Sequence, residues 1–356
     1  MKKRSELIGG EHPVSRDSSI SSKPTGKAGK FSGPLTSNID ESIVLIGGGG
    51  GVYRVARFLK HIRRNIITIQ TMFDHGGHSG LLRDERGVLP PGDIRQAIVA
   101  LADDDVESDL RALLTHRFAE KGNSSLNNAT VGNILLTSLT EITGSPISAI
   151  NTLCRWFRVK GKVLPISLDH ADLCVRLSDG SIIKGEGLID NRPISDNRTI
   201  ASAYLKPDAF LYAGAHDAIV NADKIVFCPG DLYTSIIPNV LVHGFRDALN
   251  QSNARLIYVV NIMTKKSETH GYSASKFAEI LLKYAGQERF DVVICNSARI
   301  KPSMIARYKK ERAYPVEVDS ERLKKYADRI VKADIADQTG SIVRHSGRVA
   351  SIIARL

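Results

Sequence analysis

The sequence is poor in several features that mark particular protein classes. Its four cysteines lie far apart and form no CxxC pair, so neither a disulfide framework nor a cysteine metal site is expected. Aromatic residues make up only 6% of the chain, whereas nucleic-acid grooves normally combine aromatic with basic residues, so we expect no nucleic-acid partner. No apolar run approaches the roughly 18 residues that a membrane span needs, so none is predicted.

The N-terminus lacks the features of a targeting segment. The stretch MKKRSEL carries positive charge, but no apolar stretch follows it, which argues against a secretory signal. Glu6, Glu11 and Asp17 interrupt the basic character that a mitochondrial transit peptide would need. We therefore expect a cytoplasmic protein.

Motifs of covalent hydrolysis and of P-loop chemistry are also missing. No GxxxxGK[ST] occurs, and no Ser–His–Asp or Cys–His order stands out. Asp74, His75 and His78 are residue types that bind zinc or manganese, but two histidines three apart in a loop do not define a coordination geometry. We therefore predict no bound metal at these residues and prefer hydrogen bonding to a ligand.

The net charge of +11 is concentrated at the two ends of the chain. Nine of the eleven excess positive charges lie in residues 1–40 and 301–356. Residues 1–40 are rich in Ser, Gly, Pro and Lys without apolar periodicity, which predicts a disordered basic tail. Residues 41–300 are predicted to form one ligand-binding domain, and residues 301–356 a basic, helical C-terminal segment.

The ordered part opens with a strand, a glycine run, a helix and a second strand. The apolar run Ser42–Ile46 stops at five glycines, and Val52, Val55, Ala56 and Leu59 then recur at helical spacing. A second apolar run over 65–73 follows, as at the start of a parallel doubly wound sheet. Farther on, Asp93 is placed to cap the helix that begins there.

The middle of the chain changes pattern and then returns to the first one. Short β segments over about 161–190, with the turn signal Asp179–Gly180, predict a small antiparallel insertion. Three apolar runs at 224–228, 255–260 and 291–295 then alternate with helical stretches, one of them over 239–249. The predicted fold class is therefore a three-layer, Rossmann-like α/β fold with a mostly parallel, doubly wound sheet.

The first candidate site is the glycine run at the end of the first strand. Ligands of doubly wound folds bind beyond the C-terminal ends of the strands, and glycine amides before a helix favour phosphate. As a dinucleotide fingerprint the run is imperfect, because Val52 or Arg54 stands where the third glycine belongs. The alternative is a tight strand-to-helix turn without a ligand.

Two further loops supply polar groups at strand ends. The loop Asp74–Gly80 exposes more glycines, and the arginines beyond it suit phosphate or carboxylate, although each alone could be a solvated charge. The segment Pro229–Asn239 resembles a second anion site, in which Thr234 and Ser235 can cap a helix. Tyr233 there either stacks on a base or is a core residue.

Long motifs along the chain resemble one known family. The sequence contains GGGGG after a strand, DHGGHSGLLRDERGVLPPGDIRQAIVALAD, VGNILL, PGDLYTSIIPNVLV and NIMTKKSETHGY in this order. This set is similar to the YvcK/CofD-like family, over roughly Ile43 to Arg299. The family includes gluconeogenesis factors, which bind UDP-sugars, and the 2-phospho-lactate transferases. The LPPGDIR and LYTSIIPN stretches resemble the gluconeogenesis-factor branch more closely.

The resemblance implies a set of ligand-binding residues in one cleft. These residues are Gly48, Gly49, Gly50, Gly51, Asp74, Ser79, Gly80, Arg83, Asp93, Arg95, Asn133, Gly230, Tyr233, Thr234, Ser235, Asn239, Asn261 and Thr264. The chain also departs from the family pattern, with Gly50 for a threonine, His75 for an aspartate, His78 for a serine, Asp231 for a serine and Ser267 for a glycine. Loss of the carboxylate at position 75 argues against metal-assisted transfer.

The sequence therefore favours a UDP-sugar-binding regulatory protein of carbon or cell-envelope metabolism. The alternative is a CofD-like transferase that moves a phospho-lactate-type group from a nucleoside diphosphate donor to an acceptor alcohol. Only the transferase would need Mg²⁺, and no other cofactor is implied. A nicotinamide-dependent oxidoreductase ranks third. Protein partners in regulation and a homo-oligomer are expected on general grounds.

Overall fold

A seven-stranded sheet forms the centre of the computed structural model, which describes residues 40–105, 108–122, 124 and 126–356. The predicted tail over 1–40 lies outside the described residues, apart from Asp40. All strands of this sheet are parallel, in the order β10-β9-β8-β7-β1-β2-β3. The strands are β1 (Ile43–Gly47), β2 (Ile66–Gln70), β3 (Lys162–Pro165), β7 (Lys224–Phe227), β8 (Arg255–Val259), β9 (Phe290–Asn296) and β10 (Ala327–Ala333).

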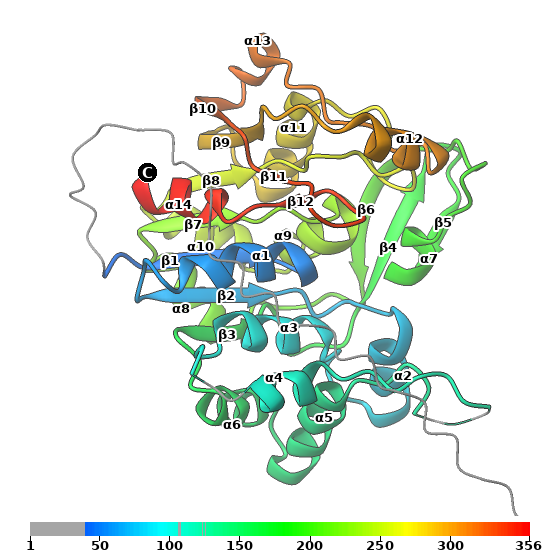
Figure 1. Cartoon of the computed structure of the whole chain (residues 1–356), viewed down its shortest axis with the longest axis vertical. Helices are drawn as coiled ribbons and strands as arrows, with labels where there is room; N and C mark the ends of the chain where they lie inside the picture. The colour runs from blue at the N-terminus through cyan, green and yellow to red at the C-terminus, as the bar shows by residue number, and fades with distance from the viewer. Residues whose placement is uncertain (1–39, 106–107, 123, 125) are drawn as a thin grey trace, which may run out of the picture. The chain divides into compact units, whose positions relative to one another are not determined.

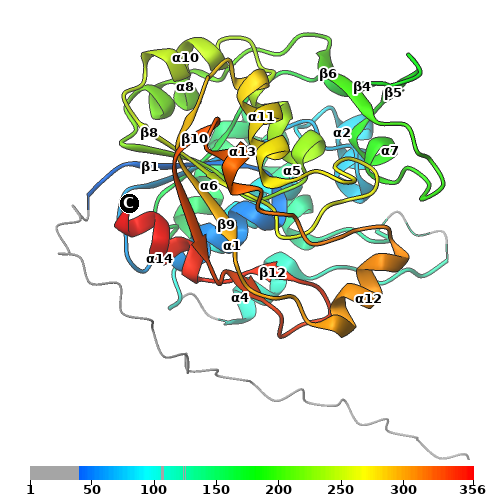
Figure 2. The same ribbon diagram turned by 90° about the horizontal axis from the view of Figure 1, so that it is seen from above.

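Helices cover both faces of this sheet, which gives the predicted three layers (Figures 1 and 2). Figure 2 shows α8, α10 and α11 on one side of the strands and α1 and α14 on the other. The bounds are α1 (Gly49–Leu59), α2 (Gly77–Arg86), α3 (Gly92–Leu101), α4 (Ser108–Thr115), α5 (Val131–Thr143), α6 (Pro146–Trp156), α8 (Ala213–Val220), α9 (Ile237–Val240), α10 (Phe245–Gln251), α11 (Ala274–Ala285), α12 (Pro302–Lys310), α13 (Ser320–Leu323) and α14 (Arg348–Arg355).

The core explains why the central strands are apolar throughout. Every residue of β1 and β2 is buried, as expected for strands covered on both faces. Helix α1 buries the predicted stripe Val52, Val55, Ala56 and Leu59 against them. Full burial of a valine or leucine side chain contributes about 1.5–3 kcal/mol, so this stripe fixes the start of α1 against the sheet.

The order of the strands places a crevice beside β1. The chain leaves β1 for β2 and β3 on one side, whereas β7, β8, β9 and β10 follow on the other side. The connections after β1 and after β7 therefore diverge, and ligands of open α/β sheets bind in the crevice at such a switch point. Among the described residues, no helix is long and apolar enough to cross a membrane.

The antiparallel insertion exists, but its predicted boundaries are wrong. Strand β3 pairs in parallel with β2 and belongs to the main sheet. The antiparallel sheet has the order β5-β4-β6, with β4 (Asp172–Leu177), β5 (Ile182–Lys184) and β6 (Ile200–Lys206), so it extends beyond residue 190. The turn at Asp179–Gly180 joins β4 to β5 as predicted, with Gly180 at φ 85°. A short helix, α7 (Glu186–Asp190), lies between β5 and β6.

The helical prediction for residues 301–356 is also wrong in part. Strand β10 is an edge strand of the main sheet, and β11 (Ala336–Asp337) and β12 (Arg344–His345) form an antiparallel hairpin. An edge strand exposes charged side chains, so the apolar run of β10 is short in the sequence. The single helix predicted over 239–249 is interrupted between α9 and α10, where Gly244 has φ 88°.

Candidate ligand-binding cleft

The glycine run begins α1 at the crevice and is packed too closely for most side chains. A Cβ at Gly48 would lie 2.5 Å from Asp93 Oδ2 and 2.8 Å from Thr71 Cγ2. A Cβ at Gly51 would overlap the carbonyl oxygen of Pro229, in the loop after β7. Gly49 has φ 53°, in the left-handed region that glycine tolerates. At Gly50, by contrast, a Cβ meets nothing within 4 Å, so this glycine faces open space.

This open space is a hollow of about 390 Å³, which we call the glycine hollow. Arg54 of α1 and Arg344 of β12 border it, and burial together with the charge of Arg344 lowers the pKa of Arg54. His345 also lines it, and burial lowers the pKa of this imidazole to about 4, so it is neutral and can donate to the Val260 carbonyl at 3.1 Å. The hollow therefore combines helix-start amides with two guanidinium groups, a favourable setting for an anion.

A second hollow of about 280 Å³, which we call the acidic hollow, lies next to it. Its lining residues are Asp74, Gly76, Gly77, Ser79, Gly92, Asp93, Arg95, Gln96, Arg117, Asn133, Glu186, Gly187, Asp190 and Asn191. Burial and the neighbouring Asp74 raise the pKa of Asp93 to about 7 and that of Glu186 to about 8. Two of the carboxyl groups that line this hollow are therefore partly protonated near neutral pH.

The two hollows meet at the glycine run and form one cleft. Asp93 lines the acidic hollow, and its carboxylate accepts a hydrogen bond from the Gly49 amide at the start of α1. The prediction that Asp93 caps its own helix is therefore wrong: the N-cap residue of α3 is Pro91, and no side chain caps this helix. Farther along, Lys265 joins Asp190 of the acidic hollow to Asp231 of the glycine hollow by ion pairs.

The segment after β7 does not expose the helix-start amides that the sequence predicted. Glu268 accepts hydrogen bonds from the Tyr233 amide and the Thr234 hydroxyl, both at 2.7 Å. Here the chain forms a π-helical turn, η1 (Leu232–Ile236), followed directly by α9. The Gly230 amide donates to Asn261 Oδ1 at 3.2 Å. These donors are satisfied within the protein, so this wall of the cleft offers few amides to an anion.

Twelve of the predicted residues line the cleft, and six do not. The glycine hollow contains Gly48, Gly49, Gly50, Gly51, Gly230, Ser235 and Asn261. The acidic hollow contains Asp74, Ser79, Asp93, Arg95 and Asn133. The side chains of Asn133 and Arg95 are joined by a hydrogen bond of 2.9 Å, and Asn133 also donates to Ser79 at 3.2 Å.

The remaining six residues hold the walls of the cleft rather than lining them. Tyr233 and Thr234 bond to Glu268, and Asn239 donates to the Ser235 carbonyl at 2.9 Å. Thr264 accepts from the Tyr314 amide, and a Cβ at Gly80 would overlap the His75 carbonyl. Arg83 donates to Asp172 Oδ1 at 2.5 Å. Tyr233 is almost fully buried, which agrees with the core alternative for this residue.

The histidine at position 75 faces away from the cleft. Its Nε2 lies 2.6 Å from Asp172 Oδ1, and Arg83 contacts the same ring. Asp172 also pairs with Lys184 at 2.6 Å, and these partners lower the pKa of Asp172 to about 2 although burial opposes them. The His75 side chain does not line the acidic hollow, and the argument against metal-assisted transfer from this position stays a prediction.

Several residues of the cleft carry no signal in the sequence. Glu186 and Asp190 come from α7 of the insertion, and Arg344 from a hairpin more than 200 residues after the glycine run. Only Arg54 could have been found, since it lies one turn into the helix that follows the glycines. Asp190, Asp231 and Glu268 have carboxylate oxygens within 4.8 Å of one another, and the ammonium of Lys265 pairs with all three and offsets part of their charge.

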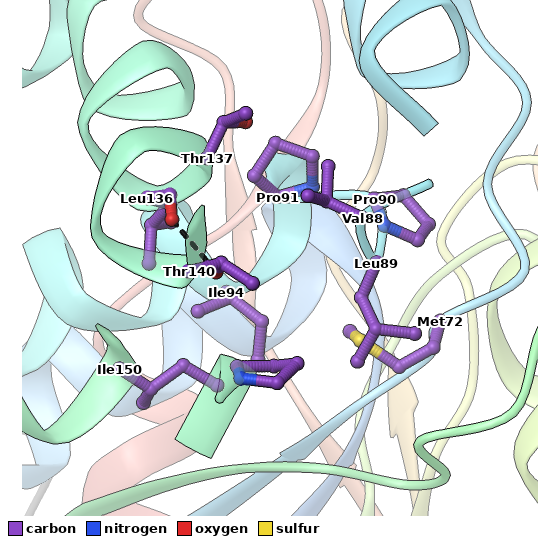
Figure 3. Close-up of a pocket in the computed structure, with 11 residues that line it drawn as sticks. Met72, Val88, Leu89, Pro90, Pro91, Ile94, Leu136, Thr137, Thr140 and Ile150 are labelled. Carbon is purple, nitrogen blue, oxygen red and sulfur yellow. Dashed lines mark hydrogen bonds between the residues drawn. The ribbon is translucent and has the colours of Figure 1, made fainter. Parts of the chain in front are cut away.

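Apolar residues of the loop before α3 pack around a small cavity (Figure 3). Leu89, Pro90 and Pro91 of this loop meet Ile94 of α3 and Ile150 of α6 around a space of about 20 Å³. This volume is close to that of one water molecule, so the cavity is too small for a ligand. Its packing instead holds the N-terminus of α3, from which Asp93 reaches Gly49.

Known proteins are similar to this chain over most of its length. The family model for 2-phospho-L-lactate transferase CofD matches residues 43–336. The gluconeogenesis factor of Halalkalibacterium halodurans is 36% identical over 312 residues, which cover 87% of this chain and 94% of that protein. The gluconeogenesis factor of Bacillus subtilis is 34% identical over 316 residues, which cover 88% of this chain and 97% of that protein.

A solved structure has the same fold. The crystal structure of a UPF0052 family member from Bacillus halodurans superposes with a TM-score of 0.82 at 35% identity, covering 88% of this chain and 99% of that one. The residues matched by the family model include both sides of the switch point, the insertion with α7 and the loop of Glu268. This chain therefore belongs to the CofD family, in which it is similar to the gluconeogenesis factors.

Proposed function

We propose that this chain binds a UDP-sugar-type nucleotide sugar in the cleft and acts as a cytoplasmic regulator of carbon or cell-envelope metabolism. The observation that carries the proposal is the glycine run at the start of α1, which lines one hollow together with Arg54 and Arg344. A helix N-terminus has a partial positive charge, and guanidinium groups bind phosphate oxygens through paired hydrogen bonds. This end of the cleft suits the diphosphate.

The acidic hollow suits the sugar. Its carboxyl groups accept hydrogen bonds from hydroxyl groups, and Ser79 and Asn133 add neutral partners. Asp74 and Glu186 lie close together, and the raised pKa of Glu186 leaves that carboxyl group partly protonated near neutral pH, so it can donate as well as accept. A neutral, hydroxyl-rich group therefore fits this hollow better than a second phosphate would.

The similarity to proteins named gluconeogenesis factors supports a regulatory role in carbon metabolism. A regulator needs to bind its ligand without converting it. Under this proposal, the ligand reports the supply of activated sugar, and the protein passes the signal to a partner.

A thermal-shift screen followed by calorimetry tests ligand binding. UDP-sugars, GDP, NAD and ADP are the ligands to compare, because a ligand that binds only the folded state raises the melting temperature. We expect UDP-sugars to give the largest shift, and Arg54→Ala to weaken their binding roughly tenfold or more. Arg64→Ala, at an exposed position after α1, is the matched control and should bind normally. The absence of any shift with UDP-sugars would reject the proposal.

The carboxylates of the cleft favour a second candidate, a CofD-like transferase. Asp74 and Asp93 line the acidic hollow beside the glycine run, and carboxylate oxygens are the ligands that Mg²⁺ prefers. These residues would hold the ion, which would balance negative charge on the transferred group. The test is release of nucleoside monophosphate from a nucleoside diphosphate donor, with Mg²⁺ and an acceptor alcohol. Turnover that Asp93→Asn abolishes would favour the transferase over the regulator.

A further inference from the structure

A pocket of about 250 Å³ lies between α1 and α3, beside the glycine run, and we call it the α1–α3 pocket. Its lining residues are Tyr53, Arg95, Gln96, Val99 and Thr115. Of these residues, Tyr53 and Thr115 lie outside the motifs that indicated the cleft, whereas Gln96 and Val99 lie within one of them but were not among the expected ligand-binding residues. The pocket is a neighbour of the acidic hollow, because Arg95 and Gln96 line both.

The distance from the α1–α3 pocket to the glycine run is similar to the distance between the base and the phosphates of a nucleotide. Tyr53 comes four residues after Gly49 in α1, which is about 6 Å along the helix axis. Gln96 Nε2 lies 3.8 Å from the position of a Cβ on Gly49. A group bound in the α1–α3 pocket is therefore separated from phosphates at the start of α1 by about the width of one ribose.

The chemistry of the lining residues suits a planar heterocycle. Tyr53 supplies an aromatic ring, which Arg57 holds with its guanidinium 5.5 Å from the ring centroid. Val99 adds a buried apolar surface, and Asn133 fixes the Arg95 guanidinium. Aromatic rings and guanidinium planes are the groups on which proteins stack bases.

The Gln96 side chain can distinguish one base from another by hydrogen bonding. Its side-chain amide makes no hydrogen bond to any residue that the structure describes. A carboxamide donates and accepts at once, so it can pair with the hydrogen-bonding edge of a base. The glycine hollow has no aromatic side chain except the neutral His345, which already bonds to Val260.

We propose that the α1–α3 pocket is the nucleobase subsite, with Tyr53 as the contact for the ring and Gln96 as the residue that selects the base. This inference rests on the proposed binding of a nucleotide sugar. It places the base over α1 and α3, the diphosphate at the glycine run and the sugar in the acidic hollow.

The experiment compares UDP, CDP, GDP, ADP and inorganic pyrophosphate by calorimetry on the full chain. For Gln96→Leu, we expect the wild-type preference among the four bases to be lost, with pyrophosphate affinity unchanged. For Tyr53→Leu, we expect every nucleotide to bind roughly tenfold more weakly, again without an effect on pyrophosphate. Thr115→Trp fills the pocket from its exposed rim and should weaken nucleotide binding without disturbing the core.

The outcomes separate this inference from the proposed function. If the wild type binds nucleotides and all three variants keep the same base preference and affinity, the nucleobase subsite is elsewhere and the inference is wrong. If the wild type binds none of these ligands, the proposed function fails and the inference fails with it. Melting temperatures of the variants show whether a loss of affinity reflects unfolding, and Thr115→Trp still tests the pocket should Tyr53→Leu prove unstable.

Discussion

Adding one methyl group at Gly51 should destabilise the protein, whereas adding it at the preceding residue should not. A Cβ at Gly51 would overlap the carbonyl oxygen of Pro229 and lie 2.6 Å from its carbonyl carbon. Ordinary van der Waals contact begins at 3.4 Å and the oxygen is closer than the carbon, so α1 and the loop after β7 would have to separate by roughly 1–2 Å. Both obstacles are backbone atoms, which cannot rotate away as a side chain would.

The magnitude follows from two opposing effects. Overpacking in a tight interior costs about 1–3 kcal/mol and occasionally more, and a backbone obstacle favours the upper end. Replacing glycine by alanine within a helix contributes about 0.5–1 kcal/mol in the other direction. For Gly51→Ala we expect a net loss of about 2 kcal/mol in the free energy of unfolding, together with weaker binding in the glycine hollow.

Gly50→Ala is the matched control, because it adds the same atom to the same helical turn. A Cβ there meets nothing within 4 Å, so only the helix propensity changes and the variant should be about 0.5–1 kcal/mol more stable. Urea denaturation of the two variants and the wild type measures both effects. If Gly51→Ala proved as stable as Gly50→Ala, the close contact between α1 and the loop after β7 would not exist as described.

Three further predictions concern charges in and around the cleft. Burial raises the pKa of Asp93 to about 7 and that of Glu186 to about 8, whereas both values are near 4 in the unfolded chain. Between its unfolded and folded pKa values, each group binds more protons in the folded protein than in the unfolded chain. Stability without ligand should therefore fall as pH rises from about 6.5 to 8, by up to about 1.4 kcal/mol per pH unit and group. Below about pH 6.5 the buried His345, whose pKa is lowered to about 4, contributes the opposite slope. A melting temperature that is flat between about pH 6.5 and 8 would contradict the burial of the two carboxyl groups. Glu268→Ala removes the acceptor for two donors, so the free energy of unfolding should fall by about 2 kcal/mol or more and ligand binding should weaken. Glu268→Gln keeps an acceptor oxygen and should restore part of the stability and part of the ligand affinity, both measured by calorimetry. Equal loss in the two variants would show that hydrogen bonding is not the role of Glu268. Asp172→Asn breaks the network around His75 and should lower the melting temperature by a few degrees. Ligand affinity, measured by calorimetry, should stay within about threefold of the wild-type value. A larger loss of affinity would mean that this network reaches the cleft.

The sequence predicted the parts of the fold that depend on local pattern. The glycine run, the apolar stripe of α1 and the run Ser42–Ile46 lie next to one another, so their spacing alone predicted strand, turn and helix. The strand β10 was missed because an edge strand carries few apolar residues, and β3 because four residues are too few to show which sheet they join.

The candidate site was predicted only in part, because here too the sequence shows local patterns but not contacts between distant segments. Glycine amides and strand-end loops leave a signature in the sequence, and twelve of the eighteen expected residues do line the cleft. Nothing local shows that Glu268 satisfies the donors of Tyr233 and Thr234, because the two segments are more than 30 residues apart. Similarly, the direction of the His75 side chain depends on Asp172, which comes from another sheet.

The bond from Glu268 to the turn after β7 has a consequence for the direction of any bound anion. One wall of the cleft presents the N-terminus of α1 together with Arg54, whereas the donors of Tyr233 and Thr234 on the facing wall are bonded to the carboxylate of Glu268. A cleft built in this way is polarised from side to side. A molecule charged at one end can settle into it in a single orientation, which is how a protein distinguishes the head of an asymmetric ligand from its tail.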